Sequence, residues 1–168
     1  MINWMHFPKN TQPDELSVQV VHAFESVSSA IDSITHQLKS DDVLACVRPG
    51  LEQLGFTVER SKRSEDLVAV PVLFGRNGKI EKSFEADAYN EKYGYVIEVE
   101  AGRGVTNYQF LKDFFEACTM SNVQQLCIAV RNVYRSSDDF EKVCRFFEAL
   151  YASNRLIVPL SGILIIGY

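Results

Sequence analysis

The sequence contains no histidine after His36, and its four cysteines form no CxxC pair. The lack of later histidines disfavours histidine-dependent nucleases, Ser-His triads and most transition-metal sites. The cysteines are scattered through apolar patterns, which indicates small core residues in a reducing compartment, with a zinc site as the alternative. They are Cys46, Cys118, Cys127 and Cys144.

Long apolar runs are also absent. No run approaches the roughly 20 apolar residues that a transmembrane helix needs. The N-terminal segment MINWMHFPKN lacks the basic-then-apolar order of a signal peptide. We therefore expect a cytoplasmic protein with no membrane contact. The net charge of −5 argues against nonspecific coating of nucleic acid, but it allows an enzyme with a local basic groove.

One stretch, residues 83–104 (SFEADAYNEKYGYVIEVEAGRG), concentrates the acidic residues that carry chemistry. Side chains alternate between the faces of a strand, so Glu98 and Glu100 point to the same side of the predicted strand over 95–101. Asp87 lies on the strand before it. Acids in a strand this rich in apolar residues are costly unless something binds them, and carboxylate oxygens are the ligands that Mg²⁺ takes. The stretch therefore predicts a metal site.

The whole chain, 1–168, is expected to form one α/β domain with a mixed central sheet flanked by helices. We divide it into an N-terminal arm and helix (1–40), a core (41–133) and a C-terminal helix with strands (134–168). Residues 1–13 look irregular, and Trp4 and Phe7 in this arm could serve a homodimer interface. We expect helices over about 14–39, 41–54, 106–120 and 136–153, and strands over about 56–60, 67–74, 80–89, 95–101, 124–133, 156–160 and 163–166.

Within the core, the strand over 67–74 is expected to be central because it is a near-continuous apolar run, although Pro71 is awkward there. Asn77-Gly78 is a strong hairpin signal. The chain then returns antiparallel over 80–89 and turns into the strand with Glu98 and Glu100. This meander places Asp87 beside the acid pair.

The order of a helix, a three-strand meander with Asp and then Glu-x-Glu, a helix and a strand resembles the PD-(D/E)xK nuclease superfamily, which has the restriction-endonuclease-like fold. The resemblance covers roughly residues 41–133. It implies that Asp87 and Glu98 bind Mg²⁺ (or Mn²⁺), with the carbonyl group of Val99 also available. The family usually has lysine where this chain has Glu100, although some restriction enzymes of the fold have glutamate there. The segments EADAY and VIEVEAGRG also resemble bacterial proteins of unknown function thought to share this fold.

Further residues have alternative interpretations. Glu52 falls where several family members place an extra acid on the first helix, and it is otherwise a surface acid. Glu100 could bind a second metal ion or act as general base for an attacking water. Arg103, in a glycine-flanked loop, could place a positive charge near a phosphate, or it is an ordinary loop arginine. Possible phosphate contacts, otherwise solvated surface residues, are Lys62, Arg63, Lys79, Lys82, Asn107 and Lys112.

These observations predict a metal-dependent endonuclease that hydrolyses phosphodiester bonds, with DNA as the expected partner, although the same chemistry fits RNA. Metal-bound water and neutralised phosphate oxygens are what such hydrolysis needs. The main alternative is a catalytically inactive protein of the same fold that binds DNA or another protein. A glycosidase with an acid pair and a structural protein with a solvated acidic face are the remaining alternatives.

Overall fold

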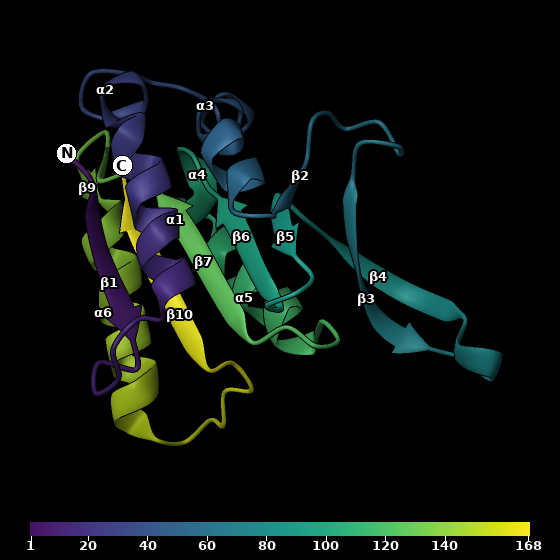
Figure 1. The fold of residues 1–168 in the computed structure, drawn as a ribbon. Coiled ribbons are helices and arrows are strands. Elements are labelled where there is room, and N and C mark those ends of the chain that lie inside the picture. The colour runs from purple at the N-terminus through teal and green to yellow at the C-terminus, as the bar shows by residue number, and fades with distance from the viewer.

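A six-stranded mixed sheet forms the centre of the protein, as the computed structural model shows for residues 1–168, with the side chains of residues 103 and 104 outside the described part (Figure 1). β10, β7 and β6 are parallel, and the strands at either side of them run antiparallel to their neighbours. The order across the sheet is β1 (Asn3–Phe7), β10 (Gly162–Gly167), β7 (Gln125–Val130), β6 (Tyr95–Val99), β5 (Ala88–Asn90) and β2 (Thr57–Val58).

Helices cover both faces of this sheet, so the predicted α/β class with a helix-flanked mixed sheet is confirmed. Alternate side chains of β6 divide between two cores: Tyr95 and Ile97 lie with the apolar residues of α1 and α3, whereas Val96 lies with those of α5 and α6. None of the helices in the described part has both the length and the apolarity of a membrane span. One face carries α1 (Glu15–Ser26), α2 (Ser28–Ile31) and α3 (Ser40–Gln53); the other carries α4 (Arg103–Thr106), α5 (Gln109–Thr119) and α6 (Asp139–Ser153).

The N-terminal segment differs from the predicted irregular arm, because residues 3–7 form β1 and pair with β10 at the edge of the sheet. Phe7 is buried and its ring packs against Phe147 and Tyr151 of α6. Trp4 stays 44% exposed. Phe7 therefore belongs to the core of the protein. Of the two residues suggested for a homodimer interface, Trp4 is the one that is exposed.

Several predicted boundaries are also corrected. The helix expected over 14–39 ends at Ser26 and is followed by the short α2. α3 begins at Ser40, one residue before the predicted start, and ends at Gln53, with Pro49 inside the helix. Residues 156–160, predicted as a strand, are not in a strand. Cys127 and Cys144 are buried as expected of core residues, whereas the other two thiols are half-buried.

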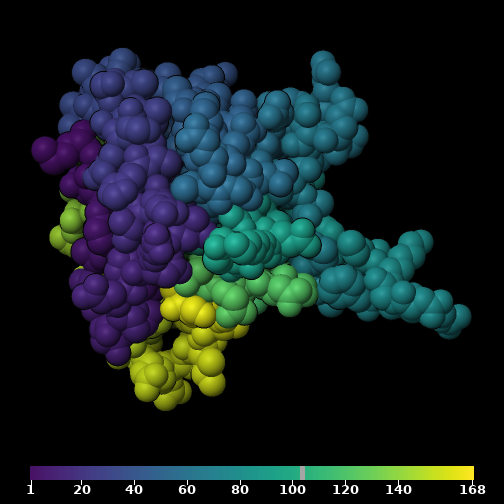
Figure 2. Space-filling view, viewed as in Figure 1, coloured from purple at the N-terminus to yellow at the C-terminus, as the bar shows by residue number. Residues whose placement is uncertain are grey.

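The strand expected at the centre of the sheet lies outside it. β3 (Val68–Phe74) pairs with β4 (Ile80–Ala86) in a separate two-stranded sheet that projects from the body (Figures 1 and 2). The predicted turn between these strands is present as η1 (Arg76–Gly78), where Asn77 has a φ of 60°. A second small hairpin joins β8 (Val133–Tyr134) and β9 (Ser137–Asp138). The position of β3 agrees with Pro71, since proline cannot donate a hydrogen bond within a central strand.

Candidate active site

Asp87 is the single residue between β4 and β5, at the point where the projecting hairpin leaves the central sheet. Its carbonyl oxygen accepts a hydrogen bond of 2.8 Å from the amide of Glu59. Its carboxylate Oδ2 accepts one of 2.7 Å from the amide of Val99 on β6. Asp87 is thus held by the strands on both sides, with its carboxylate next to the end of β6.

Glu98 and Glu100 lie at the carboxyl end of β6. Glu98 is 9% exposed within the strand, and Glu100 follows the last strand residue. The backbone of Glu100 is fixed, because its amide donates to the carbonyl of Ala129 at 2.7 Å and its carbonyl accepts from the hydroxyl of Tyr168 at 2.9 Å. Both carboxyl groups line the same cavity, as period-two alternation predicts.

Asp113 of α5 is a fourth carboxyl group of this cluster, and the sequence interpretation missed it. It is 5% exposed and lines the same cavity as Glu100. Burial, then the charge of Glu100 and hydrogen bonding with it, raise the pKa of Asp113. The signal was present in the sequence: Asp113 follows Phe110 by three residues and precedes Ala117 by four, so it lies in the apolar stripe of the helix. A carboxylate inside such a stripe needs a partner.

The four carboxyl groups surround a polar cavity of about 200 Å³. It lies at the carboxyl end of a parallel strand, where sheets of this kind commonly bind ligands. Two ammonium groups, those of Lys62 and Lys112, share the cavity with six acidic side chains. The lining residues are Ser40, Glu59, Lys62, Glu85, Ala86, Asp87, Glu98, Val99, Glu100, Gln109, Lys112 and Asp113.

Burial and mutual repulsion make these acids hard to ionise together. Burial raises the pKa of Asp87 to about 6 and that of Asp113 to about 8, and the charge of Glu100 adds to both increases. Burial and the neighbouring Asp87 raise the pKa of Glu98 well above its usual value. Burial also raises the pKa of Glu100, against the opposing effects of its bond to Asp113 and of Lys112. The cavity therefore favours a proton or another cation.

The two lysines at the cavity are already engaged by other acids. Burial alone would lower the pKa of Lys62, but Glu59, whose Oε1 is 2.5 Å from Nζ, raises it overall. Lys112 behaves similarly with Glu116, whose Oε2 is 3.3 Å from Nζ. Each lysine is therefore paired with its own glutamate at the rim, and the pKa values of Asp87 and Asp113 stay raised despite the nearby ammonium groups.

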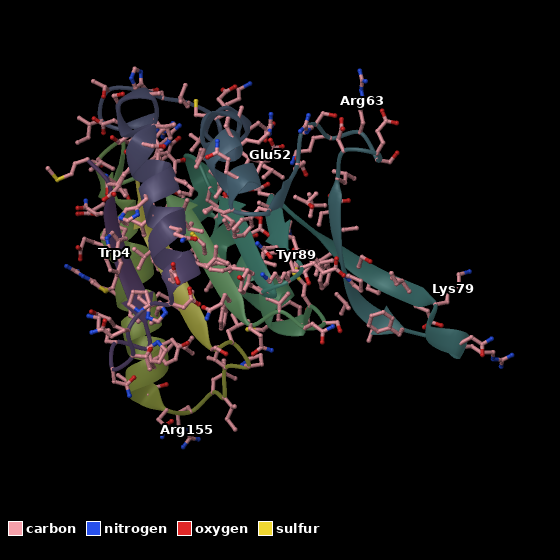
Figure 3. The ribbon with its side chains drawn as sticks, viewed as in Figure 1. Trp4, Glu52, Arg63, Lys79, Tyr89 and Arg155 are labelled. Carbon is pink, nitrogen blue, oxygen red and sulfur yellow. The ribbon has the colours of Figure 1, made fainter. Side chains whose placement is uncertain are left out.

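Most of the other predicted site residues lie elsewhere (Figure 3). Glu52 forms an ion pair of 2.8 Å with Arg60 and does not belong to the cavity lining. Arg63 is exposed in the loop after β2. Asn107 lines a separate hollow of about 390 Å³ beside Tyr134. Lys79 and Lys82 lie on the projecting hairpin, and the side chain of Arg103 is outside the described residues.

The donor set of the cavity fits Mg²⁺, which takes oxygen ligands, keeps several waters and asks for only one or two carboxylates. Asp113 Oδ2 is buried and accepts no hydrogen bond from the described residues. This oxygen is therefore free to bind a cation. Among the described residues, however, no three His, Cys, Asp or Glu side chains are placed so that they could hold a metal ion together.

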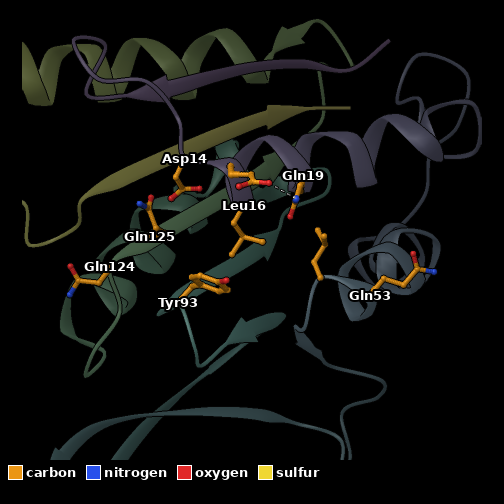
Figure 4. A pocket seen from close by; sticks show the side chains of 9 residues that line it. Asp14, Leu16, Gln19, Gln53, Tyr93, Gln124 and Gln125 are labelled. Carbon is orange, nitrogen blue, oxygen red and sulfur yellow. Dashed lines mark hydrogen bonds between the residues drawn. The ribbon is translucent and has the colours of Figure 1, made fainter.

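A roomier hollow of about 620 Å³ lies beside α1 and the turn between β5 and β6 (Figure 4). Its polar lining includes the amides of Gln124 and Gln125 and the carboxylate of Asp14. Asp14 already caps α1 by accepting a hydrogen bond of 2.7 Å from the amide of Ser17. This hollow brings together no cluster of acids comparable to that at the end of β6.

The carboxylate cavity is therefore the candidate site, and the case for it rests on its geometry and electrostatics. It combines acids from β6, from the junction of β4 with β5, and from α5, which lie far apart in the sequence. Comparison with known protein families, with curated proteins and with solved structures finds no match.

Proposed function

We propose that this cavity is the catalytic site of a Mg²⁺- or Mn²⁺-dependent endonuclease that hydrolyses phosphodiester bonds in DNA. The observation that carries the proposal is the convergence of Asp87, Glu98, Glu100 and Asp113 on one small polar cavity. The order α3, β2, β5, β6, α5, β7 supports the restriction-endonuclease-like fold within the proposal, because three antiparallel strands are followed by a helix and a parallel strand. The β3–β4 hairpin is then an insertion between the first two of these strands.

Asp87 and Glu98 are the residues we assign to metal binding. Asp87 directly precedes β5 and Glu98 lies on the adjacent β6. Their raised pKa values favour a cation at this position. A bound Mg²⁺ supplies Lewis-acid polarisation of a phosphate oxygen and lowers the pKa of a bound water. The hydrogen bond from the Val99 amide keeps the carboxylate of Asp87 oriented toward the cavity.

Glu100 and Asp113 are the proton-holding pair of the proposed site. Their raised pKa values let the pair, when it is ionised, accept a proton from an attacking water, as a general base does. The two groups titrate as a unit. Lys62 and Lys112 at the rim hold positive charge that can stabilise the negative charge developing on the phosphate.

The second candidate function is an inactive protein of this fold that binds DNA or another protein. Two observations favour it: the described residues include no ready-made set of three metal ligands, and Glu100 stands where the family usually has lysine. An inactive protein of this kind binds its partner without hydrolysing it.

The test combines metal binding with cleavage. We expect Mg²⁺ or Mn²⁺ to bind the wild-type protein in calorimetric titration and to support cleavage of plasmid or linear DNA. Asp87→Asn and Glu98→Gln should each reduce the cleavage rate by at least about 100-fold, because each removes a charge that holds the metal ion. Metal affinity should fall in the same variants.

Glu91→Gln is the matched control, since Glu91 is an exposed carboxylate in the turn between β5 and β6, outside the cavity. It should cleave at the wild-type rate. Metal binding without cleavage of DNA or RNA would favour the inactive alternative. If no metal binds at millimolar concentration and nothing is cut, the nuclease proposal is wrong.

A further inference from the structure

The β3–β4 hairpin is an arm with an exposed tip. Its strands are seven residues each, and it extends away from the sheet as a narrow projection (Figures 1 and 2). Val70 and Ala86 at its base are buried, and the carbonyl of Pro71 accepts a hydrogen bond of 2.7 Å from the amide of Ser121. The base is therefore anchored to the body, whereas residues 73–82 form the projecting tip.

The tip presents apolar side chains to solvent. Leu73, Phe74 and Ile80 are 57%, 52% and 51% exposed. A lone two-stranded hairpin is only marginally stable in water, and grouped apolar side chains on such an element indicate an interaction surface.

The charge of the tip indicates what kind of partner it fits. Arg76, Lys79 and Lys82 are exposed there, against the single carboxylate of Glu81, in a chain whose net charge is −5. Figure 3 shows Lys79 at the far end of the arm. A basic tip on an acidic protein is complementary to a polyanion, and the apolar residues beside the cations suit sugar and base surfaces.

We propose that residues 73–82 enter a groove of a B-form DNA duplex and hold it against the cavity. The proposal rests on the proposed nuclease function and names the substrate as double-stranded DNA. A two-stranded β-ribbon fits the major groove of B-DNA, which is about 12 Å wide, whereas the major groove of A-form RNA is too narrow and deep for side chains to read. Arg76, Lys79 and Lys82 contact phosphates, and Leu73, Phe74 and Ile80 contact sugars and base edges.

The arm is placed to serve the cavity. β4 runs from the tip directly to Asp87, which lies five positions after Lys82. At about 3.3 Å per residue this is roughly 17 Å, or about half of a 34 Å turn of DNA. A duplex bound at the tip therefore presents a phosphodiester within reach of the cavity half a turn away.

The experiment measures binding of a labelled 20-base-pair DNA duplex by fluorescence anisotropy in EDTA, over a range of salt concentrations. The double variant Arg76→Glu/Lys79→Glu should bind at least about tenfold more weakly, and the slope of log affinity against log salt should become shallower by about two. Phe74→Ser should weaken binding without changing that slope, because it removes no charge. An RNA duplex of the same sequence should bind more weakly than the DNA.

The matched control is Arg145→Glu/Arg155→Glu, which reverses two exposed cations on and after α6. Figure 3 shows Arg155 away from the arm. This control should leave the affinity and the salt slope nearer to wild type than the tip variant does. Equal effects of the two double variants would overturn the proposal. So would a concentration-dependent dimer in sedimentation that Phe74→Ser abolishes, because the tip would then bind a second copy of the chain.

A small diester, bis(p-nitrophenyl) phosphate with Mn²⁺, separates this proposal from the nuclease proposal. It reaches the cavity without the arm, so the tip variant should hydrolyse it at the wild-type rate while Asp87→Asn does not. Loss of duplex binding with intact diester hydrolysis supports the role of the arm. Wild-type duplex affinity in the tip variant overturns it, whether or not the diester is cut. Hydrolysis that survives Asp87→Asn counts against the cavity instead.

Discussion

Asp113 makes the stability of the metal-free protein depend on pH. Its pKa is about 8 in the folded state, raised by burial and by Glu100, against about 3.9 in an unfolded chain. Between these values the folded state binds more protons than the unfolded state, so the free energy of unfolding should fall as pH rises. Each such group can lower stability by up to about 1.4 kcal/mol per pH unit. Asp87, with a pKa of about 6, acts in the same direction up to that pH.

Urea unfolding in EDTA at pH 5, 6, 7 and 8 checks this prediction. Asp113→Asn removes the titrating group and should lose less stability than wild type across the series. Glu91→Gln, an exposed carboxylate, should follow the wild type. If the free energy of unfolding changes with pH in the same way for wild type and Asp113→Asn, the pKa of Asp113 is not raised in the folded protein and the prediction is wrong.

At the scale of single residues, the sequence predicted the positions of Glu98 and Glu100 but not that of Asp113 on α5. The alternation in 95–99 was enough to place Glu98 and Glu100 on one side, since the period of a strand is local. Asp113 reaches Glu100 only because α5 packs on that face of the sheet, and such packing is not encoded in a short window. Lys62 and Lys112 were predicted as possible phosphate contacts or solvated surface residues. Lys112 reaches the cavity on the same helix as Asp113, and Lys62 reaches it from the loop after β2.

At the scale of the elements, substitutions in β1 test whether the N-terminal segment contributes to the stability of the fold. Phe7 is 1% exposed between Phe147 and Tyr151, so Phe7→Ala should lower the free energy of unfolding by about 3–5 kcal/mol. Trp4→Ala on the same strand should cost less than about 1 kcal/mol, because Trp4 is partly exposed. Chemical denaturation measures both. Similar small losses would mean that β1 adds little to the core.

The hairpin shows why an apolar run alone does not place a strand. Residues 67–74 have the composition of a strand buried on both faces, yet Leu73 and Phe74 project into solvent. Composition reports how apolar a segment is and not what covers it. Pro71 was the local sign of a strand outside the sheet, and the Asn77-Gly78 turn was predicted correctly because turn geometry is set by adjacent residues.

At the scale of the whole molecule, the cavity joins parts of the fold that are otherwise separate. The base of the arm contributes Ala86 and Asp87, the central sheet contributes Glu98, and α5 contributes Asp113. The mixed α/β architecture was predictable because helical and strand periods alternate along the chain. The meeting of these three parts was not, because it depends on where the arm leaves the sheet.

A cation bound at this junction should stabilise the whole fold, since it is bound by the folded state and not by separated elements. At a metal concentration 100 times the dissociation constant, the gain is about 2.7 kcal/mol, which corresponds to a rise in Tm of roughly 5–10 °C for a chain of this size. Thermal unfolding with and without Mg²⁺ or Mn²⁺ measures it. The rise should be larger at pH 8 than at pH 5, because protons compete for the same carboxylates at low pH. Asp87→Asn/Glu98→Gln should abolish the rise. An equal rise in that variant would mean that the metal ion binds elsewhere on the acidic surface.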